Sequence, residues 1–226
     1  MITQHHKKKL PFDEQGYQLI EYEDFFFTKK NKKVTSKTLG EKIAVINSYF
    51  LEYLRGYNIP IAYVRKTGKR NLLFLKYTEF PFKIKILNAA DKRTAKIFSI
   101  KPGSVLELPV LEYHFGESNE SIITESHLIS FNLCTYDEIK LMNRLCSKIN
   151  AIIKSFFERR NEYLVELTCG FGKFEGKIFL IDDFSPLTLK IMKSESDIKL
   201  PDPYKIETPA QMKKYSDHLL QLTNGE

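Results

Sequence analysis

The sequence predicts an α+β fold, in which a strand-rich first part precedes a part that mixes strands and helices. Short runs of alternating apolar residues before residue 90 are typical of half-buried strands. The clearest helix comes later, at residues 136–158, and two strands and a last helix follow it. A chain of 226 residues with 42% hydrophobic residues is long enough to bury a sizeable core.

The first third is predicted to surround one helix with strands. Apolar residues of segment 40–57 recur at spacings of three and four, so they share one face of a helix. The Lys-rich segment 29–38 is expected to be an exposed loop. At residues 82–87 three apolar side chains alternate with two lysines, which indicates a half-buried strand. The other strands expected here lie at residues 17–22, 24–28, 61–65 and 71–77.

Two helices of the second part have predicted starting points. Thr135 and Glu138 have the spacing of a capping box, and an apolar stripe follows them through residues 139–156. Thr208 can cap the last helix, and Pro209 suits its first position. The other elements expected are a short helix within 89–98 and strands at 105–115, 163–168 and 177–182, with a hairpin connection at 171–176.

Composition and charge restrict the function classes. No segment approaches the ~18–20 apolar residues of a membrane span, and the charged N-terminus is not expected to be a signal peptide. Three widely spaced cysteines suit a reduced, cytoplasmic setting without a metal cluster. The net charge of +7 allows an anionic partner. Nucleic acid is not favoured, because no readout elements adjoin the lysine patches; small-molecule phosphates or a solvated basic face explain the charge equally well.

The stretch Phe179–Met192 contains the best candidates for chemistry. An apolar run ends in two adjacent carboxylates, Asp182 and Asp183, before Pro186 stops the strand. Carboxylates at the end of a buried strand are costly unless they meet a cation, a donor or solvent. Two interpretations stay open: the acids hold a metal ion, or they are solvated and open a turn.

Four segments, taken in order, resemble the SAICAR synthetase family, the ATP-dependent ligases of purine biosynthesis. The similarity spans about residues 6–193 and rests on the order and spacing of the segments more than on invariant motifs. The four segments are the helix that ends in Asn58-Ile59-Pro60, Leu72 to Ile100, Leu164 to Gly172, and Leu180 to Met192.

This resemblance implies a two-lobed layout with a nucleotide cleft between the lobes. We expect an antiparallel-sheet N-terminal lobe at residues 1–78 and a mixed α/β C-terminal lobe at 79–226. It further implies that ATP phosphorylates a carboxylate and that an amine attacks the acyl phosphate. Such chemistry requires cations on the phosphates and Mg²⁺ held by carboxylates. The implied partners are small carboxylate and amine substrates, with a homo-oligomer suggested by family analogy.

The resemblance also implies roles for individual residues. Lys7, Lys9 and Lys76 fall on positions that contact ATP phosphates. Asp182 falls on a metal-binding Asp with Asp183 beside it, so both are predicted metal ligands. Asp182 and Glu166 are the predicted catalytic acids. The predicted substrate-binding residues are Asn88, Lys92, Arg93, Ser185 and Lys190.

Several positions depart from the family pattern. Leu87 stands where the family has an Arg, and Gly170 stands where it has a Glu. A leucine cannot clamp an anion, and a glycine supplies no carboxylate. Similar losses fall at His6, Thr168, Leu187 and Met192. We therefore keep two hypotheses, a ligase with a changed substrate and a catalytically degenerate relative that binds a nucleotide or a protein. A nucleic-acid-binding protein is a third, supported by charge alone.

Overall fold

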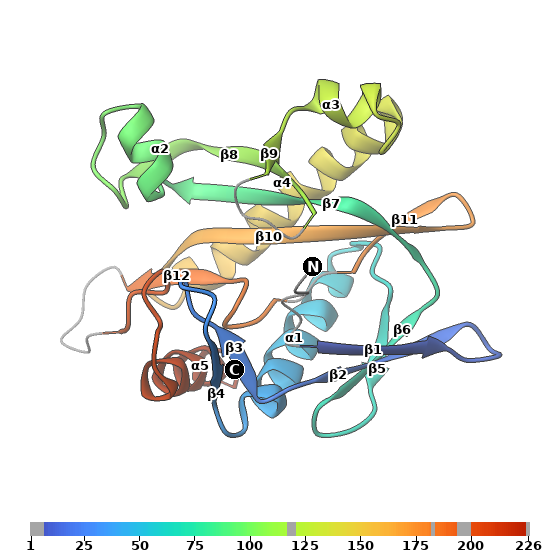
Figure 1. Ribbon diagram of the computed structural model, residues 1–226, viewed down its shortest axis with the longest axis horizontal. Helices are drawn as coiled ribbons and strands as arrows, with labels where there is room; N and C mark the ends of the chain where they lie inside the picture. The colour runs from blue at the N-terminus through green and yellow to red at the C-terminus, as the bar shows by residue number, and fades with distance from the viewer. Residues whose placement is uncertain (1–6, 117–120, 182–183, 194–199, 225–226) are drawn as a thin grey trace.

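The computed structural model describes residues 7–116, 121–181, 184–193 and 200–224. It is an α+β protein built on antiparallel sheets, which confirms the predicted fold class. Figure 1 shows the two larger sheets one above the other, with the long β7 and β10 crossing the upper part of the view. No helix among these residues is long and apolar enough to cross a membrane.

The first sheet has the strand order β1-β2-β6-β5 and is antiparallel throughout. Helix α1 contacts this sheet and buries the apolar face that its sequence predicted, with Ile43, Phe50 and Leu54 fully buried. The strands of this sheet and the helix that covers it are β1 (Lys7–Phe12), β2 (Tyr17–Tyr22), α1 (Leu39–Gly56), β5 (Tyr63–Lys66) and β6 (Asn71–Leu75).

The segment expected to be a loop after β2 holds part of a small hairpin. Strand β3 (Phe25–Phe27) pairs antiparallel with β4 (Lys33–Thr35). Lys33 lies over the Phe25 ring at 3.7 Å from the ring centroid, so its charge meets an aromatic face. The prediction of an exposed loop at 29–38 was therefore wrong for Lys33–Thr35, where cross-strand pairing outweighs the polar composition, although most of the segment is exposed as predicted.

The second sheet has the order β11-β10-β7-β8-β9, and β12 pairs with the other end of β10. Strand β10 runs on through the segment expected to be a hairpin connection. The turn is confined to Glu175 and Gly176, whose positive φ values of 48° and 77° suit a tight two-residue hairpin. The strands are β7 (Thr78–Ala89), β8 (Val105–Phe115), β9 (Ile122–Ile123), β10 (Glu162–Phe174), β11 (Lys177–Leu180) and β12 (Lys190–Lys193).

Helix α4 (Tyr136–Glu158) packs against β10 and β7 and covers one face of this sheet. Its capping box joins Thr135 and Glu138 in both directions, as the sequence predicted. Its stripe of buried apolar residues joins those of both sheets in one continuous core. Two short helices, α2 (Lys92–Ile97) and α3 (Glu125–Ser130), flank β8 and β9.

The two sheets are joined by backbone hydrogen bonds and by the last helix. The Leu180 amide donates to Pro60 (2.9 Å), and its carbonyl accepts from Ala62 (3.1 Å). Helix α5 (Pro209–Thr223) begins at the predicted Thr208 cap and packs on α1, so C-terminal residues cover the N-terminal part (Figure 1). These contacts fix the sheets relative to each other beside the polar face of the second sheet.

Candidate functional site

The face of the second sheet turned away from α4 is polar. Ile84 and Ile86 point to the core, so Lys83 and Lys85, which alternate with them, point to the opposite face. The strand register places Thr168 on one side of Lys85 and Glu112 on the other. Lys85, Thr168 and Glu112 therefore form a polar row across β10, β7 and β8.

Glu166 lies at the centre of a group of charged side chains on this face. Its Oε2 atom lies 3.1 Å from the Lys85 ammonium and accepts a hydrogen bond from the Tyr204 hydroxyl at 2.8 Å. The Lys85 ammonium also lies 3.5 Å from Asp91, the N-cap of α2. Glu166 is only 8% exposed, so these donors compensate a carboxylate that is nearly buried. We call Lys85, Asp91, Glu166, Lys190 and Tyr204 the Glu166 cluster.

Lys190 brings a second cation to this cluster. It is the cross-strand partner of Glu166 at the start of β12, and its ammonium donates to the Leu187 carbonyl at 3.0 Å. Burial lowers the pKa of Lys190, Glu166 opposes this, and the nearby cations Lys85 and Lys29 lower it further. A desolvated ammonium of this kind favours an anionic ligand.

Tyr204 reaches the cluster from the chain segment before α5. A turn holds it, because the Tyr204 amide donates to the Asp202 carboxylate at 2.9 Å. The Lys29 ammonium lies 5.7 Å from the ring centroid, so the β3–β4 hairpin also reaches this point. Burial, together with the neighbouring Glu166, raises the pKa of Tyr204, so its hydroxyl remains a hydrogen-bond donor at neutral pH.

Two of the three lysines predicted to bind phosphates, Lys9 and Lys76, lie where the first sheet meets β7. Lys7 and Lys9 are on β1, and the Lys9 ammonium forms an ion pair with Glu79 in β7. Lys76 is exposed on the link from β6 to β7, and its amide donates to Gly16 at 2.8 Å. Lys9 and Lys76 therefore both flank the junction between the sheets, although Lys9 already has an acidic partner.

The predicted metal ligands Asp182 and Asp183 lie outside the described residues. The residues on either side are buried and anchored: the Ile181 amide donates to Gly170 and the Phe184 amide to the Asn47 side chain, each at 3.0 Å. No group of three or more His, Cys, Asp or Glu side chains that could hold a metal occurs in the part of the chain that the structure describes.

Comparison with known proteins connects this fold to one family. The family model for SAICAR synthetase matches residues 11–203. The chain belongs to the SAICAR synthetase family. It is 30% identical over 200 residues to the phosphoribosylaminoimidazole-succinocarboxamide synthase of Caldanaerobacter subterraneus subsp. tengcongensis, and the match covers 86% of this chain and 84% of that protein. The synthase of Acidithiobacillus ferrooxidans is 30% identical over 149 residues. That match covers 65% of this chain and 62% of that protein, which is less than two thirds of its length.

Solved structures share the fold at lower identity. The crystal structure of the synthase from Ehrlichia chaffeensis has a TM-score of 0.87 at 23% identity, with 97% of this chain and 98% of that chain covered. A SAICAR synthetase solved in complex with ADP has a TM-score of 0.89 at 22% identity, with 98% and 96% covered. Both solved structures therefore share the fold of this protein over almost its whole length.

Two residues that the SAICAR synthetase resemblance assigned to the substrate have structural contacts here. Asn88 lies on the α4 side of the sheet, where its amide and that of Asn150 exchange two hydrogen bonds of 2.8 Å. Ser185 is fully buried, and its hydroxyl accepts from the Leu187 amide at 3.2 Å. Asn88 therefore points away from the Glu166 cluster, and Ser185 closes a turn.

Two more of the predicted substrate residues, Lys92 and Arg93, lie on α2, while Lys190 lies in the Glu166 cluster. Lys92 is exposed, and Arg93 forms an ion pair with Glu112 of the polar row. Glu112 also lies 3.2 Å from the His114 ring, so this acid meets two basic side chains. Arg93 thus reaches the polar face of the SAICAR synthetase-like sheet, but a carboxylate already neutralises it.

Sequence reasoning missed two central members of the cluster. Lys85 appeared only as one of the two lysines in a strand pattern, although that alternation already placed it opposite the core. Tyr204 gave no signal, because it is 38 residues away from Glu166 and outside any periodic segment. For Lys85, the sequence signal is its place on the polar side of an alternating, half-buried strand.

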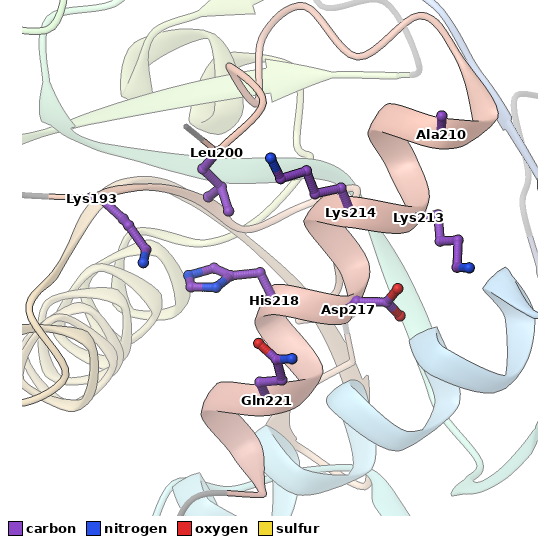
Figure 2. A pocket seen from close by; sticks show the side chains of 8 residues that line it. All are labelled: Lys193, Leu200, Ala210, Lys213, Lys214, Asp217, His218 and Gln221. Atoms are coloured by element: carbon purple, nitrogen blue, oxygen red, sulfur yellow. The ribbon is translucent and has the colours of Figure 1, made fainter. Parts of the chain in front are cut away.

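Two hollows of the surface are lined by residues outside the Glu166 cluster. Figure 2 shows the larger, of about 490 Å³, along the outer side of α5, with Lys193 and His218 pointing toward each other across it. The buried Glu162 carboxylate accepts a hydrogen bond from the His218 ring at 2.6 Å. The second hollow, of about 360 Å³, lies by the β10–β11 turn. Neither is lined by a residue that the sequence assigned to the site.

Proposed function

We propose that this protein is an ATP-dependent ligase that joins a carboxylate to an amine through an acyl phosphate. The Glu166 cluster carries the proposal, because it brings the lysines Lys85 and Lys190 together with the acids Glu166 and Asp91 on the polar face of the second sheet. Desolvated cations such as Lys190 suit the recognition of an acidic substrate. The ADP complex of a protein with the same fold supports nucleotide binding.

The proposed reaction has two steps. The substrate carboxylate attacks the γ-phosphorus of ATP, which forms the acyl phosphate and releases ADP. The amine then attacks the acyl carbon, the C–O bond to phosphate breaks, and the nitrogen loses a proton as the amide forms. Lys7, Lys9 and Lys76 are the proposed phosphate contacts. Asp182 and Asp183 would hold Mg²⁺, which prefers carboxylate oxygens and would neutralise phosphate charge.

The described contacts restrict the role of Glu166. Its Oε2 atom already accepts from Lys85 and Tyr204, so we assign it to the substrate rather than to the metal. Lys85 stands two positions before Leu87 on the same strand, and it offers a cation where the family arginine is absent. This relocated charge supports a substrate that differs from the family's ribotide and aspartate pair.

A degenerate relative that binds a nucleotide or a protein is the second candidate. The observation that favours it is the internal pairing of predicted substrate residues, because Asn88 is bonded to Asn150 and Arg93 to Glu112. Such pairing removes groups that a substrate would need. This candidate retains the fold and the lysines at the sheet junction without ligation.

We also infer a homo-oligomer in a reduced, cytoplasmic setting. The edge of β8 supports the first part: β9 pairs only with Tyr113 and His114, while Val105 and Leu108 are 64% and 77% exposed. An open apolar edge of this kind favours pairing with another chain. The three cysteines are all buried and none of them is joined in a disulfide, which supports the second part. Sedimentation analysis tests the oligomer, and a strictly monomeric protein would contradict it.

The test of the ligase is a search for coupled products. The protein is incubated with ATP, magnesium and a panel of carboxylates and amines, including aspartate, and ADP and amide products are measured by mass spectrometry. We expect ADP and an amide in equal amounts, both abolished by Asp182→Ala. ATP binding without any turnover would support the degenerate relative. Absence of both binding and turnover would exclude the ligase and a degenerate relative that binds a nucleotide.

A further inference from the structure

We propose that Tyr204 is a positioning residue that orients Glu166 so that one carboxylate oxygen is kept for a ligand. Both protein donors act on the same atom, Oε2: the Lys85 ammonium at 3.1 Å and the Tyr204 hydroxyl at 2.8 Å. Among the described residues, no group donates a hydrogen bond to Oε1. The expected effect on catalysis rests on the proposed function, whereas the orienting contact between Tyr204 and Glu166 does not.

The position of Tyr204 is set independently of Glu166. Asp202 forms the turn that carries it, accepting from the Tyr204 amide at 2.9 Å through its side chain and from the Lys205 amide at 2.8 Å through its carbonyl. Lys29 lies on the Tyr204 ring. Because turn and ring are both held by other groups, the hydroxyl is a fixed point to which the Glu166 side chain adjusts.

Lys85 alone would not fix the carboxylate in this way. An ammonium is a compact charge on a flexible stem, and it interacts equally well with either oxygen of a carboxylate. Its second acid, Asp91, also draws it toward α2. The directional bond from Tyr204 selects Oε2, and the Glu166 side chain is 10% exposed, so a small group can still reach it.

The free oxygen defines the chemical class of the ligand group. A carboxylate oxygen accepts hydrogen bonds, so Oε1 suits a substrate ammonium or hydroxyl group. Lys190, the cross-strand partner of Glu166, is a cation on the same face, and its ammonium donates to the Leu187 carbonyl. A substrate that carries a donor beside an anionic group would therefore meet both residues, and a misdirected Oε1 would lose the donor contact.

The kinetic test compares two tyrosines that each donate to a glutamate. Tyr204→Phe removes only the hydroxyl and keeps the ring under Lys29. Tyr63→Phe is the matched control, since Tyr63 donates to Glu52 at 2.9 Å in the first sheet. We expect Tyr204→Phe to lower kcat/KM for the donor-bearing substrate about tenfold, the size of one lost charged hydrogen bond. KM for ATP should stay near wild type, as should kcat/KM for Tyr63→Phe. Each variant loses one tyrosine–glutamate hydrogen bond, so their urea midpoints should fall by similar amounts.

A double-mutant cycle separates positioning from an independent effect. In a Glu166→Gln background the Tyr204→Phe change should add almost nothing to the loss of kcat/KM, because both changes act on the same carboxylate. An unchanged kcat/KM for Tyr204→Phe overturns the proposal. If Tyr204→Phe lowers kcat/KM by the same factor in the wild-type and the Glu166→Gln backgrounds, the proposal is overturned as well.

A second measurement works even if the protein ligates nothing. The rate at which a water-soluble carbodiimide and glycine ethyl ester modify Glu166 is followed by mass spectrometry of the peptide that contains it. We expect faster modification in Tyr204→Phe than in wild type, and no change in Tyr63→Phe. Missing turnover combined with faster labelling refutes the proposed function alone. Equal labelling rates in wild type and Tyr204→Phe refute the positioning role.

Discussion

The two faces of the second sheet are built from the same strands but meet opposite chemistry. On the α4 face, Ile84, Ile86 and Leu167 are fully buried among apolar side chains. On the other face, Lys85 and Glu166 are held by ion pairs and hydrogen bonds at nearly the same depth. Residues adjacent in the chain, such as Glu166 and Leu167, therefore depend on different interactions.

Because of this difference, mutations on the two faces should affect different measured quantities. Apolar burial stabilises in proportion to the area removed from water, so the α4 face should dominate the free energy of unfolding. Paired charges contribute little net stability but fix direction and recognise ligands. Mutations on the polar face should therefore affect ligand binding more than folding.

The sharpest test uses neighbouring residues of β10 that face opposite ways. Leu167→Ala should lower the free energy of unfolding by about 2–5 kcal/mol, because it leaves a cavity under α4. Thr168→Ala, on the partly exposed polar face, should change it by about 0.5 kcal/mol or less. Urea unfolding followed by circular dichroism measures both. Similar losses for the two variants would remove the contrast between the faces.

Asn88 tests whether a polar residue on the α4 face behaves as part of the core. Asn88→Ala leaves the nearly buried Asn150 amide without its partner, so we expect a loss of about 1–3 kcal/mol in unfolding free energy. Ligand affinity of the folded variant should be unchanged. If stability stays at the wild-type value while affinity or turnover falls, the substrate role predicted from the sequence is correct instead.

Lys85 tests the polar face itself against a second lysine on the same strand. Lys85→Met removes the cation between Glu166 and Asp91, and we expect a stability loss of about 1–2 kcal/mol with a larger effect on ligand binding. Lys83→Met, at the exposed neighbouring position, should cost about 0.5 kcal/mol or less. Calorimetric titration with ADP and magnesium, then with candidate acids, measures the binding. A destabilisation as large as that of Leu167→Ala would show that the polar face carries the fold.

The same contrast explains how much the sequence could predict. Helix α4 was predicted to the residue, because its capping box and apolar stripe are local. The continuation of β10 through residues 171–174 was missed because it depends on tertiary contact: a Cβ at Gly172 would lie 2.8 Å from the Tyr77 ring. A glycine that reads locally as a turn signal is instead needed for close packing between the sheets.

The candidate site was only partly predictable for a related reason. Glu166 and Lys190 followed from the family resemblance, and the structure makes them cross-strand partners. Tyr204 joins them through a turn that no periodic pattern marks. Asn88 kept its place in the pattern, but its side chain faces α4. Sequence position therefore identified the strands of the site, while side-chain direction and long-range contacts required the fold.

The smallest predicted effect concerns Asp91, which links the polar face to α2. Its carboxylate caps the helix by accepting from the Thr94 amide at 2.7 Å. Burial alone would raise the pKa of Asp91, but the hydrogen bonds from Thr94 and the charge of Lys85 outweigh it and lower the pKa. A lowered folded-state pKa means that the stabilisation is present above the unfolded pKa of about 3.9 and is lost as pH falls through the folded value. We therefore expect Asp91→Ala to cost about 1 kcal/mol at pH 7 and progressively less below pH ~4. Urea unfolding between pH 3 and 7 measures the difference between the two proteins, and a difference that grows on acidification would contradict this assignment of charge.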